Sequence, residues 1–257
     1  MDLDINNLPA NIFDTGKICP ECGEHILAAR VKFGAFVRTI ERPCSCRNAK
    51  ILAEDKATVE AKAAENRLKR YKWAAIPELF RESSLNKYER RPGTEQAYEA
   101  VKTYLLNRED NISAGKGLLL YGPCGTGKTH LGCAILNRVL ADSHTAAYWN
   151  VPEMFDLLLP GRAESNEQGD VLDKAYYARV LLLDDLGAEK PSEWTQKQLT
   201  IIVDARYRDN KPTIITTNNA GKDLLNSCGG RVYSRLMDSR KMQLVELTAE
   251  DYRRRKI

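Results

Sequence analysis

The sequence predicts an α/β protein in which helices flank a parallel sheet, and three observations carry this prediction. From about residue 94 onward, short apolar runs alternate with stretches of helical length. Several runs lack polar alternation, which is typical of parallel strands covered on both faces. One run, at residues 117–121, leads through a glycine-rich loop into a helical stretch. Strands that alternate with helices in this way favour a doubly wound sheet.

The glycine-rich loop carries the first functional signal. Residues 122–129 read GPCGTGKT and fit the phosphate-binding pattern GxxxxGK[ST], between a strand and a helix expected at residues 130–140. Glycines let backbone N–H groups close around a triphosphate, and the helix N-terminus adds partial positive charge. Lys128 is expected to reach the β- and γ-phosphates of ATP, and Thr129 to ligate Mg²⁺. A chance glycine-rich turn is the alternative, which the strand–loop–helix context disfavours. The predicted nucleotide-binding residues of the loop are Gly122, Pro123, Cys124, Gly125, Thr126, Gly127, Lys128 and Thr129.

A second strand ends in two carboxylates. Residues 179–185 read RVLLLDD, a buried type of strand that ends at Asp184 and Asp185. Ligands of open α/β sheets bind at the carboxyl ends of the strands. Asp184 is therefore expected to hold Mg²⁺, directly or through water, and Asp185 to polarise an attacking water. A strand that merely ends in a polar turn is the alternative, and the preceding phosphate loop disfavours it.

Two further positions complete the predicted site. A strand at residues 213–217 ends before Asn218, which could orient the lytic water or sense the γ-phosphate; a plain Asn–Asn turn is the alternative. Arg231 and Arg235 share one helical face at i, i+4 spacing, with no obvious acidic partner nearby in the sequence. An arginine supplied across a subunit boundary can stabilise charge in phosphoryl transfer. A structural salt bridge is the other interpretation.

The remaining elements follow from periodicity and from breakers. Residues 47–73 are rich in Ala, Glu, Lys and Arg and contain no Gly or Pro, which predicts a helix that Pro77 ends. Residues 111–116 are expected to form a turn, and the polar stretch 160–169 a loop. Other helices are expected at residues 94–107 and 192–207, from Pro152, and around Leu172, Asp223 and Arg231, with strands at 146–151 and 242–247.

Length and charge set limits on the class of protein. A chain of 257 residues can bury one substantial core plus a small appendage. The net charge of +4 is mildly basic and weakly favours a nucleic-acid partner. The basic run at residues 253–256 suits either a solvated tail or a phosphate contact. No apolar run approaches the ~18 residues of a membrane span, and the first residues lack a signal-peptide pattern. A cytoplasmic protein is therefore expected.

Four of the seven cysteines form two close pairs, Cys19 with Cys22 and Cys44 with Cys46. In a cytosolic protein this favours metal binding over disulfides. Paired ligands on two tight turns, joined by a short hairpin, suit a tetrahedral structural zinc. A redox CxxC is the alternative, but it has no need of the second pair. His25 could replace one cysteine. The other cysteines have no partner motif and are expected to be packing or loop residues: Cys124, Cys133 and Cys228.

Together these motifs resemble the DnaC-type AAA+ ATPases, the bacterial and phage replicative-helicase loaders, and the related IstB transposition helpers. The resemblance covers about residues 74–257 and includes GPCGTGKTHL, LLLDDLG, PTIITTN, and GGRVYSRLMD followed by DYRRRK. The stretch from Ile76 to Leu105 also resembles the segment that precedes the phosphate loop in that family. The resemblance implies these roles: Lys128 and Thr129 in Walker A, Asp184 and Asp185 in Walker B, Asn218 as sensor 1, and Arg235 as the arginine finger, with Arg231 as second choice.

A cysteine-rich module ahead of such a domain is similar to the DnaI-type loaders, where it engages the helicase. The implied organisation is a zinc module at residues 1–46, a helical linker at 47–73 and an AAA+ ATPase domain at 74–257. Only residues 236–257 follow Arg235, too few for a full helical lid. A lid-borne sensor 2 arginine is therefore absent, or the tail arginines replace it, and ATP turnover is expected to be slow.

The implied function is ATP-dependent delivery of the replicative helicase onto single-stranded DNA by a ring or spiral of subunits, with no membrane partner. DNA would be gripped by basic and aromatic side chains such as Tyr148 or Trp149. The alternatives are an IstB-like transposition helper, which would act on a transposase and duplex DNA, and an ATP-gated adaptor with little hydrolysis. The zinc module is unusual in a transposition helper.

Overall fold

The structure is a computed structural model that describes residues 12–33, 36–162 and 164–254. The chain divides into two compact units, Met1–Glu65 and Asn66–Ile257. The helix α1 (Ser45–Ala74) contributes residues to both units. In the described parts of the chain, no helix is both long and apolar enough to cross a membrane.

The C-terminal unit is built on a five-stranded sheet in the order β5-β6-β7-β4-β8. All neighbouring strands run parallel. The strand β4, earliest of the five in the chain, lies between β7 and β8, so the strand order reverses beside it. Open α/β sheets bind their ligands at such a point. The strands are β4 (Gly117–Tyr121), β5 (Ala146–Asn150), β6 (Val180–Asp184), β7 (Thr213–Thr217) and β8 (Met242–Glu246).

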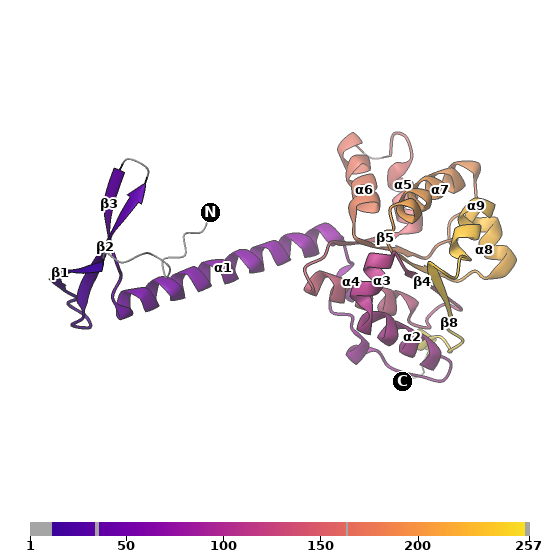
Figure 1. The fold of residues 1–257 in the computed structure, drawn as a ribbon. Coiled ribbons are helices and arrows are strands. Elements are labelled where there is room, and N and C mark those ends of the chain that lie inside the picture. The colour runs from indigo at the N-terminus through magenta and orange to yellow at the C-terminus, as the bar shows by residue number, and fades with distance from the viewer. Residues whose placement is uncertain (1–11, 34–35, 163, 255–257) are drawn as a thin grey trace. The chain divides into compact units, whose positions relative to one another are not determined.

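Helices cover both faces of this sheet (Figure 1). The expectation of a parallel sheet between helices is therefore confirmed. One face carries α2 (Glu95–Leu106), α3 (Arg108–Ala114) and α4 (Lys128–Ala141). The other carries α5 (Val151–Leu158), α6 (Ser165–Tyr177), α7 (Glu193–Arg208), α8 (Gly221–Cys228) and α9 (Gly230–Leu236).

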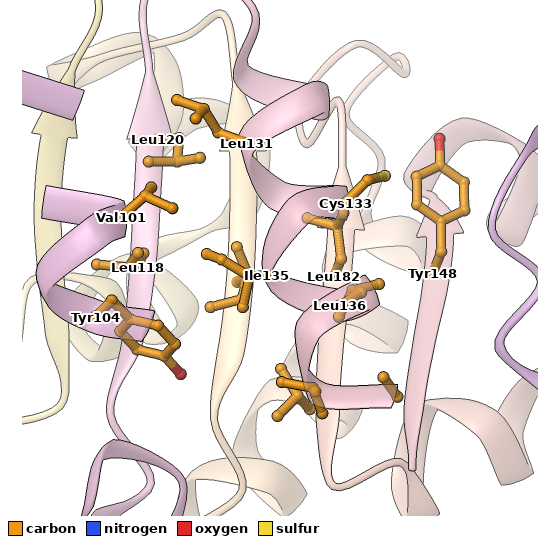
Figure 2. Packing of buried hydrophobic residues seen from close by; sticks show 14 of the residues in the cluster. Val101, Tyr104, Leu118, Leu120, Leu131, Cys133, Ile135, Leu136, Tyr148 and Leu182 are labelled. Atoms are coloured by element: carbon orange, nitrogen blue, oxygen red, sulfur yellow. The ribbon is translucent and has the colours of Figure 1, made fainter. Parts of the chain in front are cut away.

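Side chains of the strands alternate between two cores. Leu118 and Leu120 of β4 pack toward α4, whereas Leu119 between them packs into the opposite core. Figure 2 shows Leu131 and Ile135 of α4 lying over this first face. Because both faces are buried, the strand has no polar position, which explains the continuous apolar run in the sequence.

Two local predictions are wrong. Residues 111–114, expected in a turn, belong to α3, and only Gly115, with φ of 67°, turns the chain. The Asn111 side chain, which suggested a turn, instead donates to the Tyr104 carbonyl. The expected loop at 160–169 is cut short because α6 begins at Ser165. There the Glu164 N–H donates to Glu167 Oε2 (3.3 Å), which closes the helix start.

The N-terminal unit contains an antiparallel sheet in the order β1-β2-β3. Its strands are β1 (Ile12–Ile18), β2 (His25–Phe33) and β3 (Phe36–Glu41). The hairpin expected between the cysteine pairs is formed by β2 and β3. The helix expected at residues 47–73 corresponds to α1, which begins at Ser45. Cys46 therefore lies in the first turn of a helix and not on the tight turn that the sequence suggested.

Candidate functional site

A pocket of about 620 Å³ lies beside the phosphate loop. Its lining comes from the loop itself, from the segment 79–91, from Asp185 and Asn218, and from Tyr252 and Arg253. Parallel strands deliver Asp185 and Asn218 to the same edge of the sheet, because each follows the carboxyl end of its strand. The pocket therefore forms where the sequence predicts a nucleotide.

The phosphate loop depends on glycine where its backbone turns. Gly127 has φ of 95°, and a Cβ there would lie 2.7 Å from the Tyr88 ring. Gly125 has φ of 71°, and its Cβ would lie 1.7 Å from Asp251 Oδ1. Both the conformation and the close approach exclude a side chain. The loop then leads into α4, whose first residues, Lys128 and Thr129, line the pocket.

Lys128 is a buried cation held by neutral acceptors. Its side chain is 5% exposed, and Nζ donates to the carbonyl oxygens of Gly122 (2.8 Å) and Pro123 (2.7 Å) and to Asn218 Oδ1 (2.8 Å). Burial lowers the pKa of Lys128, and the nearby carboxylates partly oppose this. A phosphate oxygen would offer the ammonium group a charged acceptor, which forms a stronger hydrogen bond than these carbonyls.

Asp184 is buried among hydroxyl groups. The carboxylate accepts hydrogen bonds from Thr129 Oγ1 (2.9 Å), Thr216 Oγ1 (2.5 Å) and the Tyr148 hydroxyl (3.0 Å). Burial raises the pKa of Asp184, and the hydroxyl donors act in the opposite direction. Thr129 and Asp184, the two residues that the sequence predicts as Mg²⁺ ligands, therefore lie side by side. An Asp carboxylate beside a hydroxyl is a donor set suited to Mg²⁺ bound with nucleotide phosphates.

Asp185 adopts a left-handed backbone, with φ of 57°, that few non-glycine residues adopt. Its N–H donates to Thr216 Oγ1 (2.9 Å), which fixes the turn. The side chain lines the pocket with Lys128 and Asn218. A carboxylate in this position can accept a hydrogen bond from a water beside a bound phosphate, which is what polarising that water requires.

The two candidate arginine-finger residues have an acidic partner that sequence spacing did not reveal. Asp204 of α7 is buried, and its Oδ2 lies 2.6 Å from a terminal nitrogen of Arg231. Its Oδ1 lies 2.6 Å from Nε of Arg235, whose guanidinium also lies over the Tyr207 ring. No acidic residue stands near either arginine in the sequence, but the packing of α7 against α9 brings Asp204 to both, so the ion pairs of the alternative interpretation are present. Arg231 remains 67% exposed, whereas Arg235 is 23% exposed.

The suggested role of Tyr148 in gripping DNA is wrong, because this side chain is only 7% exposed and is bonded to Asp184. Trp149 is half-buried, with Lys174 Nζ 5.6 Å from its ring centroid. An aromatic residue in a strand is more often part of the core than of the surface, which accounts for the error.

Three pocket residues escaped the sequence motifs. The Tyr88 hydroxyl donates to the Thr126 carbonyl (2.9 Å), and Arg91 donates to the carbonyl of Gly125 (3.3 Å). The Tyr252 N–H donates to the same Gly125 carbonyl (2.9 Å), and the next residue, Arg253, also lines the pocket. The only sequence signals for them were the family resemblance of the segment before the loop, which contains Tyr88 and Arg91, and the basic tail, which adjoins Tyr252. Arg255 and Lys256 of that tail lie outside the described residues.

The four predicted zinc ligands lie together. The sulfur atoms of Cys19, Cys22, Cys44 and Cys46 are all within 4.8 Å of one another. Four thiolates on one zinc, at about 2.3 Å each, lie about 3.8 Å apart, so the cluster fits tetrahedral zinc. Backbone N–H groups of Cys22 and Glu21 lower the pKa of Cys19 to about 6, which favours the thiolate form that binds metal. His25 is not part of the cluster; its Nδ1 lies 2.7 Å from Asp14 Oδ2.

Comparison with known proteins gives two kinds of relative. The chain is 29% identical over 123 residues to the replicative helicase loader DnaI of Bacillus subtilis, covering 48% of this chain and 39% of that protein. It is 32% identical over 108 residues to the putative insertion sequence ATP-binding protein y4pL of Sinorhizobium fredii, covering 42% of this chain and 43% of that protein. The matches thus span about two fifths of the length of these curated relatives.

Solved structures agree with the fold. The crystal structure of the DnaC helicase loader superposes with a TM-score of 0.58 and 26% identity, covering 67% of this chain and all of that chain. The fold is that of an AAA+ ATPase. Between β8 and Arg254 the structure contains only the short helical turn η4 (Tyr252–Arg254), so this part of the chain holds no helical lid. Residues 47–256 match the family described as IstB-like ATP binding protein, and the chain belongs to this ATP-binding family.

Proposed function

We propose that this protein is an ATP-dependent loader that binds the replicative DNA helicase and delivers it onto single-stranded DNA when replication begins. The observation that carries the proposal is the presence in one chain of a phosphate-loop pocket and a four-cysteine cluster. The similarity to DnaI and to the DnaC loader supports it. The cluster favours the loader over the transposition helper, because a zinc module is unusual in a transposition helper.

In this proposal the pocket holds ATP with Mg²⁺. Lys128 binds the β- and γ-phosphates, and Thr129 and Asp184 hold the metal ion, which neutralises charge on the phosphate oxygens. Asp185 polarises the attacking water, and Asn218, already bonded to Lys128, senses the γ-phosphate. Arg253 replaces the lid arginine, since η4 brings it to the pocket. The segment from Leu79 to Arg91 supplies one wall of the pocket, and its Tyr88 and Arg91 contact the phosphate loop.

The proposed assembly is a ring or spiral in which one subunit completes the site of its neighbour. Arg235 is the first candidate for the contact across the boundary, with Arg231 second. The pairing of both arginines with Asp204 is compatible with this role. If Arg235 turns to a neighbouring γ-phosphate, Asp204 keeps Arg231 as its partner and is not left as an unpaired buried charge.

The N-terminal unit is proposed to bind the helicase through one face of its sheet. Ile12, Phe36 and Ile40 are 53%, 75% and 44% exposed. The register pairs Ile12 and Ile40 with Ala29 from opposite sides, so these residues share a face, and Phe36 lies on the same face of β3. An exposed apolar face of this kind marks an interaction surface. Zinc at the cysteine cluster would hold this small unit in shape.

The transposition helper remains the second candidate, because the family and y4pL support it. Binding assays with the full chain separate the two functions. We expect the protein to bind the hexameric replicative helicase of its host and not an insertion-sequence transposase. Phe36→Asp should abolish helicase binding, whereas Val37→Asp, on the opposite face of the same strand, should not. Binding to the transposase alone would overturn the loader function in favour of the second candidate.

A further inference from the structure

The hydroxyl of Tyr148 reaches the predicted Mg²⁺ ligand Asp184 from a neighbouring strand. We propose that Tyr148 is a positioning residue, which holds the Asp184 carboxylate toward Mg²⁺ and so sets the affinity of the nucleotide site for that ion. The inference rests on the proposed ATP site but assigns a role to a residue outside every motif of the sequence. It replaces the role in DNA contact that the sequence suggested for this tyrosine.

The contact is specific to one carboxylate oxygen. The Tyr148 hydroxyl donates to Asp184 Oδ2 at 3.0 Å, whereas Thr216 donates to Oδ1 at 2.5 Å. Thr129, the third donor, lies 2.9 Å from Oδ1 and 3.2 Å from Oδ2. Thr129 is also expected to ligate the metal ion. Tyr148 and Thr216 are therefore the two donors free to fix the carboxylate from its protein side, one on each oxygen.

The strand register explains why a tyrosine is needed. In β5 and β6, Tyr148 pairs with Leu182, and Asn150 pairs with Asp184. Tyr148 and Asp184 thus share a face but lie two positions apart, about 7 Å along the strands. A phenol spans that distance, whereas the hydroxyl of a serine or threonine at position 148 would fall short. Figure 2 shows the Tyr148 ring beside Cys133 and Leu182 with its hydroxyl directed toward the carboxyl end of β5.

The surroundings of the tyrosine keep this geometry fixed. Tyr148 is 7% exposed and packs in the same core as Cys133 and Leu182. A phenol is protonated at neutral pH, so the Tyr148 hydroxyl acts as a hydrogen-bond donor to the carboxylate. Groups that orient metal ligands in this way change metal affinity by about 10–100-fold when they are removed.

The test compares Tyr148→Phe with a matched control, Tyr104→Phe. Tyr104 is also buried, at 4% exposure, and its hydroxyl donates to the Lys116 carbonyl (2.9 Å), ahead of the amino end of β4. Each variant loses one hydrogen bond of a buried tyrosine, so both should show a similar, small loss of stability in urea unfolding. Binding of a fluorescent ATP analogue to the full chain is then measured against free Mg²⁺ concentration.

We expect Tyr148→Phe to need about tenfold more Mg²⁺ for half-maximal enhancement of nucleotide binding, with unchanged binding in EDTA. Tyr104→Phe should match the wild type both in its Mg²⁺ dependence and in its nucleotide binding in EDTA. A wild-type Mg²⁺ dependence in folded Tyr148→Phe would overturn the inference. If that variant does not fold, Tyr148→Met should show the same shift, and its absence there would also overturn the inference. Failure of the wild-type protein to bind the analogue at all would instead contradict the proposed ATP site.

Discussion

Lys128 and Asn218 are hydrogen-bonded although 90 positions separate them, and Thr129 and Asp184 although 55 do. The sequence could predict that these residues lie near one another because Asp184 and Asn218 stand at the carboxyl ends of parallel strands, and Lys128 and Thr129 follow the carboxyl end of β4 through the phosphate loop. No such rule covers Tyr88 or Arg91, which reach the phosphate loop from an irregular segment. Their positions depend on long-range packing that residue patterns do not encode.

At the residue scale, the first prediction concerns Lys128. Lys128→Ala removes the only Walker A cation, and charge-assisted hydrogen bonds are worth about 1.5–3 kcal/mol each. We therefore expect affinity for a fluorescent ATP analogue to fall at least tenfold. Lys116→Ala, at the amino end of β4, is the matched control and should bind as the wild type does. Wild-type affinity in Lys128→Ala would show that the pocket is not the nucleotide site.

At the element scale, buried runs such as residues 117–121 and 180–184 were predictable because strands covered on both faces admit no polar residue. The start of α6 and the extent of α3 were not. Each depends on a single local feature that turn-forming residues nearby obscure in the sequence. For α6 this is the hydrogen bond between Glu164 and Glu167, and for α3 it is the left-handed conformation of Gly115. The cysteine pairs were predictable as a cluster, but the position of Cys46 on a helix was not.

The second prediction concerns this cysteine cluster. We expect one zinc per chain, held by Cys19, Cys22, Cys44 and Cys46, because the four sulfurs lie within 4.8 Å. Removing the metal with a chelator should unfold the small sheet but leave ATP binding intact, since metal binding supplies much of the folding free energy of such modules. Metal analysis and circular dichroism check this. Well under one zinc per chain, with all four thiols titratable in the folded protein, would refute it.

At the scale of the whole molecule, the five-stranded sheet with its order β5-β6-β7-β4-β8 places the phosphate loop at the reversal of strand order. The ion pairs of Arg231 and Arg235 with Asp204 show what sequence spacing misses. Asp204 lies on α7, and only the packing of α7 against α9 brings the three residues together. The predicted ring requires that Arg235 or Arg231 contact the nucleotide of a neighbouring subunit.

The third prediction tests sharing of sites between subunits. Arg235→Ala should leave ATP affinity nearly unchanged but lower ATP hydrolysis, because a contact across the boundary acts on charge that develops in the transition state. Mixing Arg235→Ala with Lys128→Ala subunits should partly restore hydrolysis, since some interfaces then pair an intact loop with an intact arginine. Arg231→Ala, mixed in the same way, identifies which arginine acts. If co-assembled mixtures never recover activity, Arg235 serves only its own subunit, through Asp204.

In the proposed function, ATP binding in this chain drives delivery of a helicase onto DNA. The most direct test measures the amount of replicative helicase bound to closed circular single-stranded DNA. We expect the wild-type protein with ATP to increase this amount about tenfold or more over helicase alone, equivalent to at least about 1.4 kcal/mol. Lys128→Ala should give no increase. If the amount of helicase on the DNA were the same with the wild type, with Lys128→Ala and without the protein, the proposed loader function would be contradicted.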